Sequence, residues 1–206
     1  MREAAGASPG AALLRPLLIA VSGQYGRDYH ADGPGQELLL DTADALAAEL
    51  KVTVQVETHR HRLLFNPWSA RRAVARRPAL RVIADLSHYV NVCEAPPGDA
   101  DLEEAVAELV PRVTHTHARV GHEEGPQVPD VADPRWGAHV AGHVAWWKAI
   151  FRAHVARGAE VCTVTPEFLP FPYGPVGFGR AETAAANAHI AGVVREAWAQ
   201  VVAEER

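Results

Sequence analysis

The sequence is poor in cysteine, in long hydrophobic runs and in surplus positive charge. Its 206 residues include only two cysteines, Cys93 and Cys162. Two thiols cannot make a disulfide framework or a zinc site built from several thiolates. A reducing compartment is therefore expected, and we predict a cytoplasmic protein.

No apolar run approaches the ~20 residues that a helix needs to cross a bilayer. Even the stretch LLRPLLIAV is interrupted by Arg15 and Pro16, so no membrane partner is expected. The formal net charge of -5 gives no general attraction to a polyanion, so nucleic acid is not an expected partner either. The arginine pairs at 71–72 and 76–77 are the one basic cluster, and we interpret them as a solvated helix face.

Strand-like runs alternate with segments of helical apolar spacing over most of the chain. Residues 1–16 have no periodicity and are predicted to be a disordered leader, followed by one domain at 17–206. Strands are expected to begin near residues 17, 52, 80, 113 and 160. Helices are expected at 36–50, 69–77, from a cap at Asp101, before a stop at Gly158, and at 180–204. The pattern predicts an α/β protein with about five parallel strands and surrounding helices.

In the first of these helices, the spacing of four apolar residues predicts a stripe that packs on the sheet. The stripe consists of Leu39, Ala43, Leu46 and Leu50.

Four of the strand-like runs end in Glu, Asp or His. They are VTVQVETHR at 52–60, LRVIADLSH at 80–88, VTHTHARVG at 113–121 and EVCTVTPEF at 160–168. Parallel strands deliver the residues at their carboxyl ends to the same end of a sheet or barrel. The sequence therefore predicts a site built from Glu57, Asp85, His117 and Glu167.

Side-chain alternation along a strand indicates which residues share a face. It places Glu57 with Thr53 and Gln55, away from the neighbouring valines, and it places Glu167 with the threonines at 163 and 165. These faces are expected to line the interior, while Cys162 faces the helices as a small core residue. His115 shares the face of His117, and we predict a hydrogen-bonded interior histidine rather than a fifth ligand.

Three carboxylates and one imidazole form an oxygen-rich set that suits Mn, Mg or Co, with Zn as a further candidate. A divalent metal ion there could polarise a carbonyl and stabilise an enediolate. A carboxylate on each side of the substrate could then move protons, which is how a sugar is epimerised or an aldose and a ketose are exchanged.

The chain from about residue 20 to 200 resembles the xylose isomerase-like barrels, in particular the sugar-phosphate isomerase/epimerase group. The resemblance rests on ETHR at 57–60, DLSH at 85–88, HTHARVG at 115–121 with GPQVPD at 125–130, and TPE at 165–167. It implies a (β/α)8 TIM-type barrel, and a sugar-like small molecule as substrate.

The resemblance also assigns roles to individual residues. The metal positions fall to Glu57, Asp85, His117 and Glu167, and the two glutamates double as the catalytic acid/base pair. Contacts with substrate oxygens fall to His59, His88 and Arg119.

The family builds eight strand-helix units in ~250 residues, whereas five are found here, and the first three units of the family have no counterpart. The sequence therefore predicts a partial barrel with open sheet edges, and self-association through such an edge is expected. A partner chain could complete the barrel. The smaller number of strand-helix units leaves other interpretations open. The chain could be a non-catalytic remnant or binding module of the same fold, an incompletely predicted gene product, or a metal-dependent hydrolase of the endonuclease-like branch. The net charge of -5 and the few strand-end histidines count against the hydrolase.

Several other polar or aromatic residues are interpreted without a function. His139 and His143 lack the HExxH pattern and are predicted to be a surface pair. Glu123 and Glu124 are read as exposed loop carboxylates. The tryptophans are packing residues, with Trp68 and Trp136 expected near the rim of the site.

Overall fold

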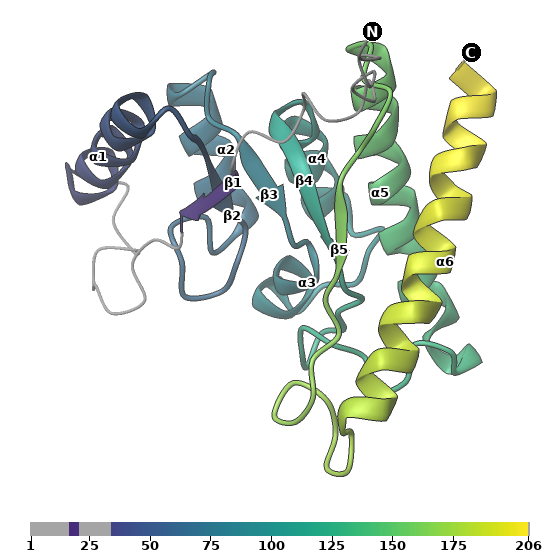
Figure 1. Cartoon of the computed structure of the whole chain (residues 1–206). Coiled ribbons are helices and arrows are strands. Elements are labelled where there is room, and N and C mark those ends of the chain that lie inside the picture. The colour runs from purple at the N-terminus through teal and green to yellow at the C-terminus, as the bar shows by residue number, and fades with distance from the viewer. Residues whose placement is uncertain (1–16, 21–33, 206) are drawn as a thin grey trace, which may run out of the picture.

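The computed structural model describes residues 17–20 and 34–205 (Figure 1). The predicted disordered leader at 1–16 lies outside the described residues. Within the described part of the chain, no helix is long and apolar enough to cross a membrane.

A parallel sheet forms the centre of the structure. Its five strands are β1 (Leu17–Ala20), β2 (Thr53–Glu57), β3 (Val82–Ala84), β4 (Val113–Ala118) and β5 (Val164–Pro166). They are hydrogen-bonded in chain order, β1-β2-β3-β4-β5, and every neighbouring pair is parallel. The sheet curls like half of a barrel, with helices around it (Figure 1). The predicted α/β class and the five predicted strand positions are confirmed.

Six α-helices connect the strands or follow them. They are α1 (Pro34–Leu50), α2 (Pro67–Arg76), α3 (Ser87–Cys93), α4 (Ala100–Leu109), α5 (Gly137–Ala156) and α6 (Arg180–Glu205). Short 3-10 turns, Val110–Arg112 and Pro134–Trp136, follow α4 and precede α5. Five of the six helices match predicted segments. Helix α3 was not predicted, because its seven residues are too few to show helical periodicity.

The starts of the helices follow from side chains that accept backbone N–H groups. Asn66 accepts the N–H of Ser69 at 2.8 Å at the start of α2. Asp99 accepts the N–H of Leu102 at 3.0 Å and caps α4, so the prediction that Asp101 is the cap was wrong by two residues. A carboxylate at this position satisfies a helix N–H that has no partner within the helix.

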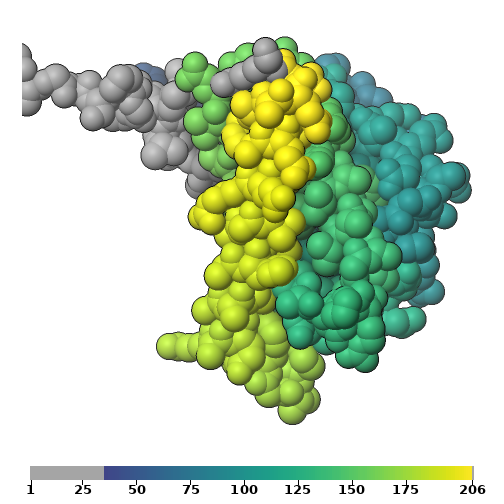
Figure 2. All heavy atoms as spheres, turned by 90° about the vertical axis from the view of Figure 1, so that its right-hand side faces the viewer, coloured from purple at the N-terminus to yellow at the C-terminus, as the bar shows by residue number. Residues whose placement is uncertain are grey.

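The hydrophobic core lies between the sheet and the helices α2, α4, α5 and α6. Its central members include Val82, Leu109, Trp147, Ile150 and Ile190, each at most 1 % exposed. Helices α5 and α6 pack side by side, and α6 runs along this side of the molecule in Figure 2. This packing fixes β4 and β5 from the outside and leaves the carboxyl ends of the strands to carry polar residues.

Helix α1 packs differently from the prediction. Leu39, Leu46 and Leu50 of the predicted stripe are 38 %, 46 % and 59 % exposed, whereas Leu40 is buried. The helix faces the sheet with Leu40 and is also joined to α2 by ion pairs. Arg77 pairs with Glu37 at 2.8 Å and with two aspartates of α1.

The basic cluster of α2 lies on an outer face, as predicted, but much of it is ion-paired. Arg76 reaches Glu37 of α1 at 3.1 Å, and Arg71 reaches Glu104 of α4 at 3.3 Å. The cluster therefore joins three neighbouring helices.

Candidate metal centre

The structure brings the four predicted ligand residues together at the carboxyl end of the sheet. Glu57 is the last residue of β2, Asp85 directly follows β3, His117 lies in β4, and Glu167 directly follows β5. One potential ligand atom from each residue lies within 4.8 Å of those of the other three. The group could hold a metal ion, and its convergence results from four adjacent parallel strands that end at the same edge.

His117 occupies the centre of this group. Its Nδ1 atom lies 2.9 Å from Glu57 Oε1 and 2.9 Å from Glu167 Oε2. Burial disfavours a charged imidazole, but the two carboxylates outweigh it and raise the pKa of His117 to about 10. Burial also raises the pKa of Glu167.

The contacts around His117 are close but poorly aligned for hydrogen bonds. His117 Nδ1 and Glu167 Oε2 are both buried without a well-directed hydrogen-bond partner among the described residues. Buried polar atoms in proteins are almost always hydrogen-bonded or bound to an ion. In the absence of an ion, the protonated His117 ring compensates the charge of the two carboxylates. A divalent cation that displaced this proton would meet an imidazole nitrogen and several carboxylate oxygens around one shared space, and a donor set rich in carboxylate oxygen fits a hard divalent ion.

Asp85 is fully buried and is held on both carboxylate oxygens. Its Oδ1 accepts hydrogen bonds from the backbone N–H of Ser87, at 3.2 Å, and from the Ser87 hydroxyl. Its Oδ2 accepts a hydrogen bond from Arg119 Nη2. Burial alone would raise the pKa of Asp85, but the charge of Arg119 and the hydrogen bond from the Ser87 hydroxyl hold it well below its usual range. Asp85 is therefore ionised and fixed in orientation.

His88 and Arg119, two of the predicted substrate contacts, form the wall behind Asp85. Arg119 Nη2 donates to His88 Nε2 at 2.7 Å, so the proton of His88 resides on Nδ1. Burial lowers the pKa of His88 to about 2 and keeps the ring neutral. The third predicted contact, His59, lies against His88, with 3.8 Å between the ring centroids and the ring planes tilted by 44°.

Two residues that were not predicted from the sequence, Thr58 and Tyr173, also lie around the metal group. The hydroxyl of Thr58 accepts the backbone N–H of Asp85 at 2.8 Å and donates to its carbonyl at 2.9 Å, which ties the end of β2 to the end of β3. The ring of Tyr173, in the loop after Glu167, lies 4.9 Å from Arg119 Cζ and 5.4 Å from Arg60 Cζ. The one available signal for Tyr173 was an aromatic residue in the loop that follows a ligand-bearing strand.

His115 is an interior histidine that hydrogen-bonds to β5 and its preceding residue. Its Nδ1 lies 2.8 Å from the Thr163 hydroxyl and its Nε2 lies 3.0 Å from the Thr165 hydroxyl. The predicted strand faces and the predicted role of His115 are therefore confirmed.

The prediction of a surface pair at His139 and His143 was wrong. His143 is fully buried, donates from Nδ1 to the carbonyl of His139 at 2.9 Å, and accepts the N–H of Gly121 at 3.3 Å. Burial lowers its pKa to about 4, so the ring is neutral. His139 pairs with Glu123 at 3.0 Å, and Glu123 therefore points to α5 rather than to the metal group. The spacing of four residues between His139 and His143 therefore reflects a hydrogen bond within α5 rather than a metal site.

Comparison of the chain with protein-family models, curated proteins and solved structures found no match.

Proposed function

We propose that the chain is a metal-dependent isomerase or epimerase that acts on a small sugar or a related hydroxy-carbonyl compound. The observation that carries the proposal is that Glu57 and Glu167 each place a carboxylate oxygen 2.9 Å from His117 Nδ1, in one group with Asp85. Two carboxylates that reach one shared space could act as acid and base on the same substrate.

The sheet supports a relation to the TIM-type (β/α)8 barrel, as in the xylose isomerase-like family. Its strands follow one another in chain order without the reversal that defines a doubly wound sheet. The buried polar residues Gln55 and His115 lie on the inner face with Glu57, and the candidate site is at the carboxyl ends, where such barrels carry their active sites. The five strands would correspond to part of a barrel.

The donor set fits a divalent ion, with Mn, Mg or Co favoured by the three carboxylates and Zn as a further candidate. Such an ion, when bound, polarises a carbonyl and stabilises negative charge on oxygen. The residues that would hold it are Glu57, Asp85, His117 and Glu167.

The chain's own residues would then carry the proton transfers. One of the two glutamates removes a proton from the carbon beside the carbonyl, and the other returns a proton to the enediolate at the neighbouring carbon or on the opposite face. Glu167 suits this role because burial raises its pKa toward the pH range in which a carboxyl group can both accept and release a proton.

Two buried donors without partners would orient the substrate. His88 Nδ1 and Arg119 Nη1 are buried and make no hydrogen bond within the described part of the chain. A substrate oxygen would satisfy them once a movement of neighbouring side chains opened the site, because His88 and Arg119 are at most 1 % exposed. His59 lies against His88, with its ring plane tilted by 44°, and would hold that ring in place.

The test combines metal binding with proton exchange. Calorimetric titration with Mn, Mg and Co should show one site, and the loaded protein should incorporate deuterium from D2O into a member of a panel of small aldoses and ketoses. Glu57→Gln should weaken metal binding and lower exchange about a hundredfold or more, because it removes a negative ligand and a proton acceptor together. Glu124→Gln is the matched control, because Glu124 is an exposed loop carboxylate. Exchange that persists undiminished in Glu57→Gln would refute the assigned role.

A non-catalytic metal-binding module is the second candidate. The described sheet has two open edges, at β1 and β5, so fewer walls surround the site than in a closed barrel. Catalysis depends on holding the substrate within reach of its acid and base, whereas ion binding needs only the ligands. Metal binding without exchange of any tested substrate would favour this candidate.

A further inference from the structure

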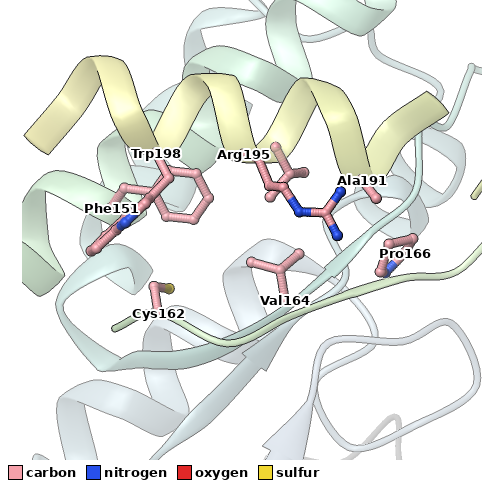
Figure 3. A pocket seen from close by; sticks show the side chains of 8 residues that line it. Phe151, Cys162, Val164, Pro166, Ala191, Arg195 and Trp198 are labelled. Carbon is pink, nitrogen blue, oxygen red and sulfur yellow. The ribbon is translucent and has the colours of Figure 1, made fainter. Parts of the chain in front are cut away.

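A hollow lies on the side of β5 that faces away from the metal group, between this strand and the helices α5 and α6 (Figure 3). Its volume is about 280 Å³. The walls are largely apolar, and Arg195 is the one cationic side chain in them. The apolar part of the lining includes Phe151, Cys162, Val164, Pro166 and Trp198. Thr163 and Thr165 point to His115 on the inner face. The hollow is therefore separated from the metal group by the strand itself.

One end of the cavity is formed by aromatic rings and a thiol. Phe151 of α5 and Trp198 of α6 meet edge to face, with 5.5 Å between ring centroids and 87° between the ring planes. Burial raises the pKa of the Cys162 thiol to about 12, so its sulfur contributes a neutral wall. An apolar group placed here would exchange water for aromatic and aliphatic contacts.

The other end carries the guanidinium of Arg195. Figure 3 shows this side chain reaching from α6 toward β5, on the side of Ala191 and Pro166 and away from Phe151. No carboxylate pairs with Arg195 among the described residues, whereas Arg152 of α5 is paired with Glu204 farther along α6. A guanidinium beside an apolar cavity presents a planar fork of donors that matches a carboxylate.

We propose that this cavity binds a small monocarboxylate with an apolar body. The body packs against Phe151 and Trp198, and the carboxylate accepts hydrogen bonds from Arg195. The volume is at the small end of the ~300–1,000 Å³ that ligand pockets span, which favours a short chain or a single ring. One cation balances one negative charge, which favours a monocarboxylate over a phosphate ester.

Calorimetric titration with three probes of equal chain length tests the charge requirement. Octanoate should bind, octan-1-ol should bind about tenfold more weakly, and octylammonium should not bind measurably. The tenfold difference is what one charge-assisted hydrogen bond contributes. Equal affinity for octanoate and octylammonium, or no binding of octanoate, would overturn the proposal.

Variants test the location. Arg195→Gln should weaken octanoate about tenfold and leave octan-1-ol unchanged. Arg180→Gln, an exposed arginine at the start of the same helix, is the matched control and should leave both unchanged. Ala191→Leu should fill the cavity and weaken both probes, with thermal unfolding as the check that the fold persists.

An octanoate affinity that Arg195→Gln leaves unchanged would place the ligand elsewhere and overturn the assignment. Sedimentation tests whether a second copy of the chain, rather than a small carboxylate, occupies the cavity. A change of oligomeric state in Ala191→Leu would mean that a second copy covers this face, and it would also overturn the proposal. Mn binding by Arg195→Gln should equal that of the unmodified protein, so this result is independent of the proposed enzymatic function.

Discussion

Asp85 compensates the buried positive charge of Arg119 at the candidate site. It pairs with Arg119, which is only 1 % exposed, and it accepts two hydrogen bonds from Ser87. Two charges withdrawn from water in this way do not add much net stability, but removing one of them leaves the other buried and poorly compensated. The cost of breaking the pair therefore far exceeds the value of having it.

Asp85→Asn should destabilise the protein by about 3–5 kcal/mol, because it removes the charge that compensates Arg119. The nearest remaining carboxylate of the group is Glu167, whose Oε2 lies 3.7 Å from Arg119 Nη2. Urea unfolding at neutral pH measures the change. Asp133→Asn is the control, because its partner Arg135 is exposed, and the unfolding midpoint should scarcely move. Equal midpoints for the Asp85 and Asp133 variants would show that Arg119 is not charge-compensated by Asp85.

At the scale of elements, the close approach of the loop after β4 to α3 holds the site together. Gly121 follows β4 by three residues, and a Cβ atom there would lie 2.4 Å from the carbonyl oxygen of Ser87. Ser87 begins α3 and hydrogen-bonds to Asp85. The absence of a side chain at residue 121 therefore permits the placement of a candidate metal ligand.

Gly121→Ala should cost about 1–3 kcal/mol, because the added methyl group meets backbone that must shift. Mn affinity should fall as well, since the shift moves Ser87 and with it the carboxylate of Asp85. Gly192→Ala is the matched control: no heavy atom lies within 4 Å of its Cβ position in α6, so the protein should gain about 0.5–1 kcal/mol. Thermal unfolding and Mn titration of both variants provide the measurement. A Gly121→Ala protein that matches the unmodified one in both would contradict this account of the loop.

At the scale of the whole molecule, the described sheet is open at both ends. Strands β1 and β5 each pair with one neighbour only among the described residues, and an unpaired strand edge attracts another chain. Near β1, helix α1 exposes Leu38, Leu39, Leu46 and Leu50. This surface, rather than the cavity of Arg195, is where we expect copies of the chain to meet.

Sedimentation of the purified protein should reveal self-association that rises with concentration. The double variant Leu46→Gln, Leu50→Gln should shift the equilibrium toward monomer, because it removes apolar area from the exposed face of α1. Val176→Gln is the control, since Val176 is 90 % exposed but lies in the loop after β5. A monomer at all concentrations that also unfolds cooperatively would contradict this prediction.

Much of the fold and the membership of the candidate site were readable from the sequence. Alternation along a strand is a local property, so it identified the inner face that carries Glu57, His115 and Glu167. Parallel strands end at one edge, so the order of Glu, Asp, His and Glu at four strand ends was enough to predict a common site. Glycine and proline marked the boundaries, and Gly158, with a φ of 77°, ends α5 as expected.

The tertiary structure decided which of two plausible faces is buried and what each polar group contacts. The spacing of Leu39, Leu46 and Leu50 is that of a buried stripe, but α1 turns Leu40 to the sheet and leaves these residues exposed. His139 and His143 were predicted to be a surface pair, but His143 is buried and accepts the N–H of Gly121 from the loop after β4. Tyr173 and Arg119 meet from separate loops. Such contacts depend on residues far apart in the chain, whose approach is set by packing energy, whereas strand alternation and turn preferences are set by the local backbone.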